Sequence, residues 1–329
     1  MPKIRLATFN VENLLMRCDF EAAGVEDLRA KLTQVSSPEE AAKISSVFNV
    51  LSEDDRTLTA QALAATRADV CAVQEVENLV TLTTFHDKYL ARWIDAPMPF
   101  HALHEGNDRR GIDVGALSRL EIVHQRSHAK ASFASLGIQP PIGEHANARV
   151  FRRDCLELDV VKDGAKLSLF ICHFKSMHGG REKSRHIRDA EARGVRAIIE
   201  ARFKSPESEN WAILGDLNDY LEIDGVPDTE HGLGPLLEDG FSVDIAMACI
   251  GKPKERWSHH FKPLRQYSAL DHILLSPKLA DLNQGASVSY IRAGMPWRAE
   301  RHKGYRLAGV GWAKPKASDH CPLVAAITF

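Results

Sequence analysis

Short apolar segments recur along this chain, and most of them carry an acid, an amide or a histidine at one end. The clearest is residues 211–219 (WAILGDLND), where four apolar residues precede Gly215, Asp216, Asn218 and Asp219. Four consecutive apolar residues are typical of a buried strand, and a glycine allows a tight turn where the strand opens into a loop. Binding and catalytic side chains concentrate in such loops. On this stretch alone, an Asx-rich turn explains the same residues equally well.

The same pattern repeats elsewhere along the chain. Polar residues stand at the ends of other strand-like runs at Asn10, Glu12, Glu75, Asp113, His173, Asp271, Asp319 and His320. Carboxylates that come together repel one another unless a proton or a cation intervenes. The oxygen-rich set favours Mg²⁺ or Mn²⁺ over zinc, because the chain lacks closely spaced His and Cys ligands.

The composition limits the class of protein. With 329 residues and 44% hydrophobic residues, the chain has enough apolar surface for a substantial core, and no shift in composition marks a linker. A net charge of −2 argues against nonspecific coating of nucleic acid, although it is compatible with a local basic groove. The six cysteines are scattered, and no segment approaches the apolar length of a membrane span. We therefore expect reduced cysteines, a cytoplasmic location and no stable membrane association.

Several elements can be predicted from periodicity. Strands are expected at 3–9 and 70–73, neighbouring strands at 100–104 and 114–117, and a hairpin at 156–161 and 167–172. An apolar stripe at 187–199 indicates a helix that packs on a sheet. Residues 18–56 have helical periodicity, and Ser37, Pro38 and Glu40 have the order of a capped helix start, which indicates a helical insertion.

Residues 290–317 combine basic and aromatic side chains. Seven lysines and arginines stand against the single acid Glu300 and alternate with Trp297, Tyr305 and Trp312. Such segments are typical of surfaces that bind phosphates and stack on bases. The alternative is a solvated, charged loop that its aromatic residues anchor to the protein.

Seven motifs, in a fixed order along the chain, carry a resemblance to a known family. They are TFNVENLL from Thr8, VQEVEN from Val73, RGIDV from Arg110, HFKS from His173, GDLND from Gly215, LDHILLS from Leu270 and SDHCP from Ser318. The ordered set resembles the endonuclease/exonuclease/phosphatase superfamily, which includes deoxyribonuclease I, apurinic endonucleases, inositol polyphosphate phosphatases and neutral sphingomyelinases. The resemblance covers nearly the whole chain.

This resemblance implies an α/β (α+β) fold of the deoxyribonuclease I type. We expect a four-layer α/β/β/α sandwich, with two mostly antiparallel sheets packed face to face and helices outside. The resemblance also implies a single domain over residues 1–329, with the helical insertion at about 18–56. The site is expected at one end of the strands.

The resemblance implies roles for the matching residues. Glu75 would be the principal ligand of a Mg²⁺ or Mn²⁺ ion, and around the same ion, directly or through water, would stand Asp319, Asn10 and Glu12. His320 would be the general base that takes a proton from the attacking water. A hydrogen bond to Asp271 would orient its ring and keep it basic.

Other residues would contact the substrate. Asp216 and Asn218 would hold the phosphate, the attacking water or a second ion, and His173 would donate to a phosphoryl oxygen or assist the leaving group. Asp113 is the candidate partner of His173. Weaker candidates for substrate contacts are Lys175, Arg153 and Tyr267. We expect the adjacent His259 and His260 to be loop residues, because they are not spaced like a zinc pair.

The prediction for function is a metal-dependent phosphodiesterase, in first place a nuclease. The basic and aromatic segment, RGIDV and HFKS look most like bacterial members of the superfamily with nuclease character, and the expected partner is nucleic acid. A phosphomonoesterase or a lipid phosphodiesterase is the alternative; an exposed apolar hairpin would favour the lipid, and none is evident outside the strands. A catalytically inactive binding module is a further alternative, although it should have lost the base or a metal ligand.

Overall fold

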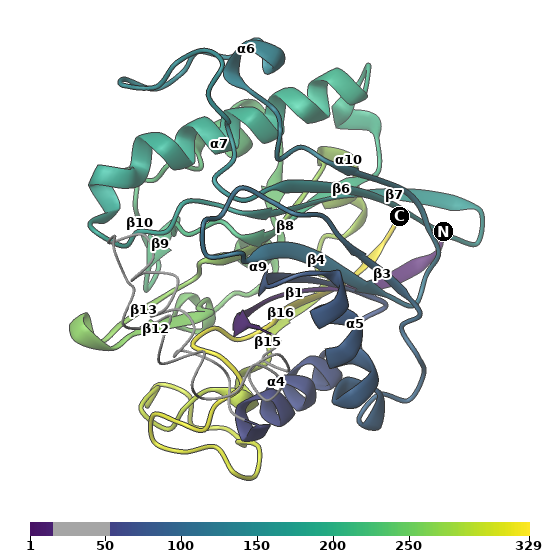
Figure 1. The fold of residues 1–329 in the computed structure, drawn as a ribbon, viewed down its shortest axis with the longest axis vertical. Helices are drawn as coiled ribbons and strands as arrows, with labels where there is room; N and C mark the ends of the chain where they lie inside the picture. The colour runs from purple at the N-terminus through teal and green to yellow at the C-terminus, as the bar shows by residue number, and fades with distance from the viewer. Residues whose placement is uncertain (16–52) are drawn as a thin grey trace, which may run out of the picture.

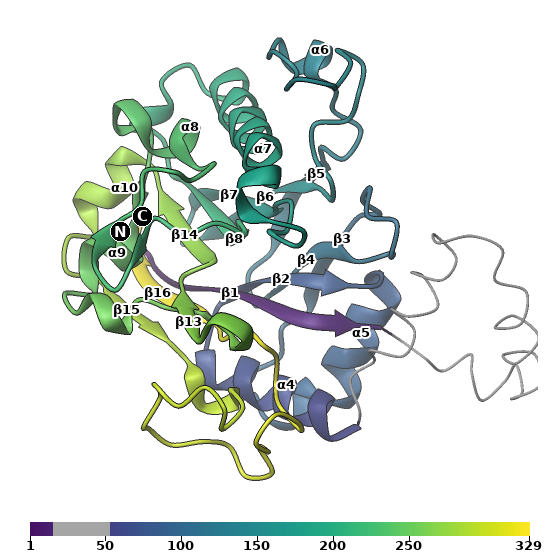
Figure 2. The same ribbon diagram turned by 90° about the vertical axis from the view of Figure 1, so that its left-hand side faces the viewer.

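The computed structural model describes residues 1–15 and 53–329, so most of the helical insertion expected at 18–56 lies outside the described residues. Two six-stranded sheets pack face to face, and helices cover their outer faces. From top to bottom in Figure 1, the layers are helix α7, one sheet, the other sheet, and helices α4 and α5; Figure 2 shows the same layers from the side. The expected four-layer α/β architecture is confirmed.

The first sheet has the order β15-β16-β1-β2-β4-β3. Its strands are β1 (Lys3–Leu14), β2 (Val70–Val76), β3 (Phe100–Leu103), β4 (Asp113–Ser118), β15 (Ser287–Tyr290) and β16 (Leu323–Thr328). Strands β1 and β2 run parallel, and the other pairs are antiparallel. The pairing expected between 100–104 and 114–117 is confirmed by β3 and β4.

The second sheet has the order β11-β14-β8-β7-β6-β5. Its strands are β5 (Ile122–Ser127), β6 (Cys155–Lys162), β7 (Ala165–His173), β8 (Trp211–Asp216), β11 (Val243–Asp244) and β14 (Asp271–Leu275). Here β7 and β8 are the parallel pair, and the expected hairpin is confirmed by β6 and β7. Each sheet is therefore mostly antiparallel, with one parallel pair near its centre.

Helices shield the outer face of each sheet. The first is covered by α4 (Glu53–Thr66) and α5 (Leu79–Lys88), and the second by α7 (Arg181–Arg202) and α8 (Gly234–Leu237). Further short helices are α6 (Phe133–Leu136), α9 (Ile245–Cys249) and α10 (Pro277–Leu282), with 3₁₀ turns at Leu90–Arg92, Pro206–Ser208, Glu238–Gly240, Pro253–Glu255, Lys262–Leu264 and Arg292–Gly294. Two-stranded ribbons are formed by β9 (Glu222–Ile223) with β10 (Val226–Pro227), and by β12 (His259–Phe261) with β13 (Gln266–Ser268). Within the described ranges, no helix combines the length and the apolar character that a membrane crossing requires.

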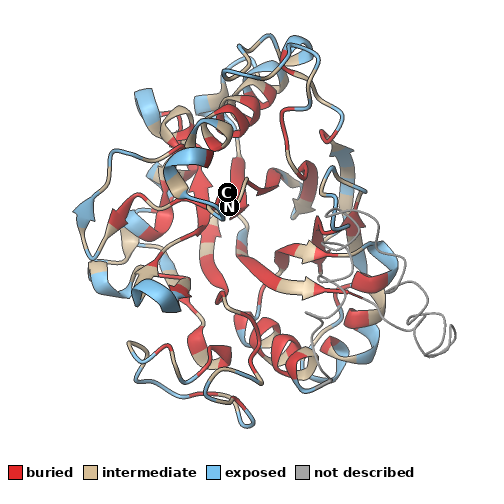
Figure 3. Cartoon of the chain, turned by 60° about the vertical axis from the view of Figure 1, so that its left-hand side comes forward, coloured by how far each residue is buried: buried red, intermediate tan, exposed pale blue. Residues whose placement is uncertain are grey.

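The core consists of three apolar layers. One fills the space between the sheets, where Leu158, Leu169 and Leu214 are fully buried, and the others lie under α4 and under α7. In Figure 3 the red, buried residues run through both sheets. Burying one such leucine contributes roughly 1.5–3 kcal/mol. Because both faces of each sheet are covered, the central strands are rich in apolar residues, which explains why sequence located them, whereas the edge strands β5, β11 and β15 were not predicted.

The two parallel pairs determine where functional groups meet. Parallel neighbours end at the same edge of a sheet, so β1 and β2 deliver their carboxyl ends together, as do β7 and β8. At these ends the backbone is irregular: Glu12, Asn13, Glu75 and Asn218 all have positive φ angles. Such conformations are unfavourable for non-glycine residues and cluster at functional sites. Strand β1 also continues past the expected end at residue 9 to Leu14, with a register shift after Asn10.

Candidate active site

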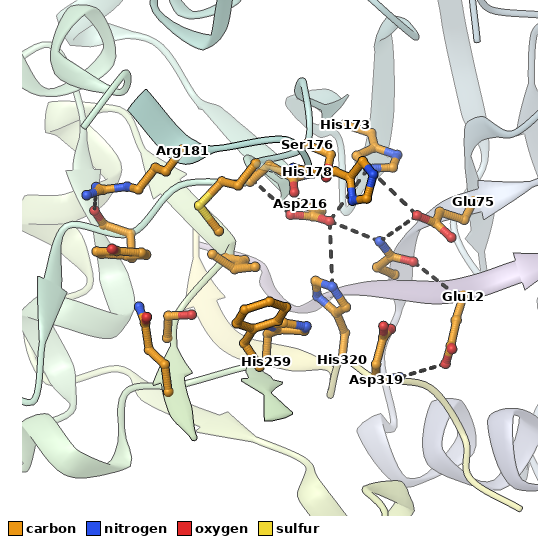
Figure 4. A pocket seen from close by; sticks show the side chains of 18 of the residues that line it. Glu12, Glu75, His173, Ser176, His178, Arg181, Asp216, His259, Asp319 and His320 are labelled. Atoms are coloured by element: carbon orange, nitrogen blue, oxygen red, sulfur yellow. Dashed lines mark hydrogen bonds and ion pairs between the residues drawn. The ribbon is translucent and has the colours of Figure 1, made fainter. Parts of the chain in front are cut away.

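The strand ends border a pocket of about 790 Å³. Figure 4 shows the side chains of both sheets pointing into it. Among the residues that line it are nine of the site residues proposed from the sequence: Asn10, Glu12, Glu75, Arg153, His173, Asp216, Asn218, Asp319 and His320. The fold therefore brings together groups that lie as much as 310 positions apart, as the positions of the first and last of these residues show.

Asp216 lies at the centre of this group. Its Oδ2 atom is 2.9 Å from Asn10 Nδ2, 3.6 Å from His173 Nε2 and 3.8 Å from His320 Nε2. Gly215 makes this position attainable, because a Cβ atom there would lie 1.9 Å from the carbonyl oxygen of Cys172 and the φ angle is +151°. Burial and the neighbouring Asp271 raise the pKa of Asp216 to about 7. The pocket thus holds negative charge that a cation would stabilise.

His320 and Asp271 form a buried pair. The His320 Nδ1 atom is 2.7 Å from Asp271 Oδ2, and the Asp271 side chain is fully buried behind the ring. Strand pairing places Asp271 directly opposite Asp216. Burial by itself lowers the pKa of His320, but the charges of Asp271 and Asp216 outweigh it and raise that pKa well above 6.5. Two carboxylates therefore make the His320 ring more basic than an ordinary histidine, and its Nε2 atom faces the pocket.

His173 differs from His320 in its electrostatics. Burial and the nearby Arg153 and Arg110 guanidinium groups lower the pKa of His173 well below 6.5, so its ring is neutral. The Nδ1 atom has no hydrogen-bond partner among the described residues. The expected pairing with Asp113 is wrong: Asp113 accepts a hydrogen bond of 2.8 Å from the Gly106 N–H instead. The turn at Gly106 curls back over this carboxylate, and Asp113 is not among the residues that line the pocket.

The ends of β1 and β2 meet through Asn10 and Glu75. The Asn10 amide donates to Asp216 and, at 3.4 Å, to Glu75 Oε1, while Glu75 Oε2 accepts from the Asn13 N–H. Glu75 Oε1 also lies 4.0 Å from His173 Nε2, and its side chain keeps 15% of its surface exposed toward the pocket. Both Glu75 oxygens thus accept hydrogen bonds from uncharged donors, and the carboxylate is partly exposed at the pocket.

Glu12 and Asp319 lie next to each other, below Glu75 and to the right of His320 in Figure 4. Glu12 Oε2 accepts a hydrogen bond of 2.8 Å from the Asp319 N–H, and both Glu12 oxygens contact the Lys316 ammonium. Burial and the Asp319 carboxylate raise the pKa of Glu12 to about 7. For Asp319, burial is outweighed by Lys316 and His320, which hold the pKa below its usual range.

The weaker candidates for substrate contacts divide into two groups. Arg153 lines the pocket, although its guanidinium is already held by Asp108 and by the Phe174 carbonyl. Lys175 and Tyr267 are not among the residues that line it. Tyr267 stacks on His260, with ring centroids 4.4 Å apart, and its hydroxyl accepts from the Arg301 N–H.

Sequence reasoning missed His259. It lines the pocket, pairs by a backbone bridge with His320, and places its ring centroid 4.8 Å from that of His320. Burial and the His320 charge lower the pKa of His259 to about 4, so its ring is neutral. The expectation that His259 is only a loop residue is wrong, because strand β12 directs it into the site. The hairpin that contains β12 was not predicted, and no local pattern in the sequence marks His259 as a residue of the site.

The hairpin of β12 and β13 also corrects an expectation about apolar surface. At its tip, Phe261 and Leu264 are 46% and 70% exposed and both line the pocket. The sequence had indicated no exposed apolar hairpin outside the strands. The hairpin was not predicted because its strands are only three residues long and Pro263 stands between them.

The basic and aromatic segment 290–317 lies away from the pocket lining. Several of its charges are engaged within the protein: Arg292 stacks on Trp257, Arg301 pairs with Asp224, and Arg306 stacks on Trp297. These contacts agree with the alternative of a charged loop anchored by aromatic residues. The segment therefore lends less support to nucleic-acid binding than its composition suggested.

Comparison with known proteins identifies a sequence family. A model described as the endonuclease/exonuclease/phosphatase family matches residues 5–241. No curated protein sequence matches the chain.

Solved structures share the fold. A truncated TDP2 from Caenorhabditis elegans has 14% identity and a TM-score of 0.56, with 99% of this chain and 98% of that chain covered. TDP2 from D. rerio, in a complex with a single-stranded DNA product, has 16% identity and a TM-score of 0.53, with 99% of each chain covered. An endonuclease/exonuclease/phosphatase family protein from Leptotrichia buccalis C-1013-b has 14% identity and a TM-score of 0.54, with coverage of 99% and 100%.

Proposed function

Because the chain belongs to the endonuclease/exonuclease/phosphatase family, and is therefore a hydrolase that acts on phosphoester bonds, we propose that it is a metal-dependent nuclease. The observation that carries this proposal is the meeting of Asp216, His173, Asn10 and the His320–Asp271 pair in one pocket. These are the groups that an anionic diester requires: donors for its oxygens and a base for the attacking water.

The side chains that could act as metal ligands in the pocket fit a hard divalent cation. Oxygen ligands predominate, because Glu12, Glu75, Asp216 and Asp319 bring four carboxylates to one pocket. We propose Glu75 as the principal ligand of Mg²⁺ or Mn²⁺, with Asn10, Asp319 and Glu12 around the same ion directly or through water. When bound, such an ion neutralises charge on the phosphoryl oxygens. The three-residue group Asp216, Asp271 and His320 also has metal-ligand spacing, but the short His320–Asp271 hydrogen bond favours a proton-transfer role there.

The protein's own residues supply the remaining steps. Asp271 holds the Nδ1 proton of His320, so Nε2 is the atom that accepts a proton from the attacking water once the ring has lost its second proton. His173, whose neutral ring faces Asp216 with Nε2, is placed to donate a hydrogen bond to a phosphoryl oxygen. Asn218 is held by Phe174 through its amide and by Asp216 through its N–H, so it positions the phosphate with little loss of side-chain entropy.

Nucleic acid is the substrate that the wider pocket supports best. Arg110, Arg153 and Arg181 line it and bring positive charge toward a chain of phosphates, although each also pairs with a carboxylate of the protein. A neighbour of the same fold, TDP2 from D. rerio, is bound to a single-stranded DNA product. A lipid phosphodiester is the second candidate, which the exposed Phe261 and Leu264 at the pocket rim favour, because apolar side chains there suit an acyl chain.

A metal add-back assay tests the proposal. Metal-stripped protein is incubated with plasmid DNA, a single-stranded oligonucleotide, bis-p-nitrophenyl phosphate, p-nitrophenyl phosphate and sphingomyelin vesicles, with and without Mg²⁺ or Mn²⁺. We expect metal-dependent cleavage of the diester and of DNA, absent in His320→Ala. Cleavage of sphingomyelin or the monoester alone would overturn the nuclease assignment, and loss of every activity with the ion bound would support an inactive binding module.

A further inference from the structure

Lys316 places a buried positive charge against Glu12, one of the acids that line the pocket, although Lys316 itself does not line it. Its Nζ atom lies 2.7 Å from Glu12 Oε1 and 2.5 Å from Glu12 Oε2, and its side chain is only 4% exposed. The same Glu12 carboxylate accepts the Asp319 N–H at 2.8 Å. Lys316, Glu12 and Asp319 thus form one connected unit beside His320.

The backbone around Lys316 is fixed by helix α4. The Lys316 N–H donates to Asp55 Oδ1 at 2.8 Å, and the next carbonyl, that of Ala317, accepts from the Thr59 hydroxyl at 2.5 Å. The Ala317 N–H is bound by the Gly294 carbonyl. The backbone that carries Lys316 is therefore fixed, and its ammonium can reach solvent only by breaking its contacts with both Glu12 oxygens.

This arrangement constrains where a divalent ion can bind. Both oxygens of Glu12 already contact donors, and a cation bound directly to them would have to displace the ammonium from a buried position. A second divalent ion between Glu12 and Asp319 would also lie against a like charge in a site of low dielectric, which is unfavourable. The difference at Glu75 is the absence of a resident cation: its oxygens accept from the neutral Asn10 amide and the Asn13 N–H, and among the described residues it forms no ion pair with a lysine or an arginine.

We propose that Lys316 is a resident cation that neutralises Glu12 and Asp319, so that the pocket binds one divalent ion, against Glu75, and Glu12 is not a direct ligand of it. Lys316 is then a positioning residue: through Glu12 it holds the Asp319 backbone, from which His320 follows directly. This inference rests on the proposed metal-dependent function and specifies how many ions that function uses.

Titration of metal-stripped full-length protein with Mn²⁺, followed by the electron paramagnetic resonance signal of the free ion, counts the bound ions without any assay of activity. Wild-type protein is expected to bind one Mn²⁺ per chain. Lys316→Met removes the charge and keeps the length of the side chain, so Glu12 and Asp319 should together acquire a second ion, or bind it at least about tenfold more tightly than wild type does.

Matched variants separate charge from loss of structure. Lys314→Met, which changes an exposed lysine two positions earlier, and Lys316→Arg, which keeps the charge, should each bind one ion. The double variant Glu12→Gln with Lys316→Met removes both charges together. It should bind one ion with an affinity within about threefold of wild type, because Glu12 does not contact the ion. This double variant also tests the proposal if Lys316→Met alone does not fold.

Each outcome is decisive. Two ions in wild type, an unchanged Mn²⁺ isotherm in Lys316→Met, or loss of the ion in the double variant would overturn the role of Lys316 while leaving a metal-dependent enzyme. If wild type binds no Mn²⁺, the metal-dependent function and this inference fall together. Glu75→Gln, which should abolish binding, distinguishes the specific ion from weak surface association.

Discussion

Asp271 acts on the reaction only through His320, which makes it a sharp test of the base. Asp271→Asn keeps the volume of the side chain but removes the charge that holds the Nδ1 proton, and its amide can donate to the ring instead. We expect kcat for bis-p-nitrophenyl phosphate to fall by about 10³-fold, as is typical when a histidine base loses its orienting carboxylate. The circular dichroism spectrum should be unchanged. A loss smaller than about tenfold would show that His320 works without Asp271.

A second buried pair, His272 and Asp244, predicts a pH-dependent stability. The His272 Nδ1 atom lies 2.6 Å from Asp244 Oδ2, and its Nε2 lies 2.9 Å from the Asp219 carbonyl oxygen. Burial lowers the pKa of His272, but the hydrogen bond and charge of Asp244 outweigh it and raise the pKa above 6.5. A raised pKa in the folded state stabilises the protein below the unfolded pKa, and this contribution is lost as the pH rises through the folded value.

Asp244→Asn isolates this contribution. Asparagine still caps helix α9, because the Asp244 Oδ1 atom that accepts from Ala246 and Met247 remains an oxygen. We expect the variant to be destabilised by about 2 kcal/mol at pH 6, and by less at pH 9. Urea unfolding at both pH values measures the difference. A destabilisation that is equal at both would mean that His272 is neutral throughout.

At the scale of elements, helix α7 is tied to the loop that follows β8. The Asp219 carboxylate accepts from Arg188 Nε at 2.8 Å and from Arg181 Nε at 2.6 Å, and Asp219 stands next to Asn218 in the site. Both Arg188 and Asp219 are fully buried. The helix thereby fixes the backbone that presents Asn218 to the pocket.

Removing Arg188 leaves the buried Asp219 carboxylate with one arginine, Arg181, instead of two. Arg188→Met should destabilise the protein by about 3–5 kcal/mol, as is typical when one member of a buried ion pair is removed. Arg185→Met, one turn earlier on the same helix, breaks a pair with Glu230 that is largely exposed and should change stability by less than about 1 kcal/mol. Urea unfolding of both variants gives the comparison, and equal effects would contradict a special role for the buried pair.

Sequence predicted strands and motifs better than it predicted contacts between them. Strand β8 begins with four consecutive apolar residues and β1 and β7 are rich in them, so composition located these strands, and the resemblance carried by the ordered motifs indicated the sandwich. The pair Lys316–Glu12 spans 304 positions, and no local pattern links its members. His259 was missed for the same reason, because only the backbone bridge to His320 shows that it enters the site. The insertion predicted at 18–56 lies mostly outside the described residues.

At the scale of the whole molecule, the pocket concentrates charge between the two sheets. Strands of the first sheet contribute Asn10, Glu12 and Glu75, and strands of the second contribute His173 and Asp216. Carboxylates on the two sheets repel one another, and this repulsion opposes the packing of the sheets unless a cation reduces it. Binding of a divalent ion should therefore stabilise the sandwich as a unit, in addition to any role in the reaction.

Thermal unfolding with and without Mn²⁺ tests this coupling. A ligand that binds only the folded state at 100 times its Kd stabilises by about 2.7 kcal/mol, and for a protein of this size each kcal/mol raises Tm by about 2 °C or somewhat more. We expect Tm to rise by about 5 °C in wild-type protein and in His320→Ala, which keeps the acidic groups, and not at all in Glu75→Gln. The His320→Ala result separates binding from turnover, because that variant should bind the ion without catalysis. An equal rise in Glu75→Gln would place the ion outside the pocket, since a site that bridges the two sheets must lose its stabilising effect when its accessible carboxylate is removed.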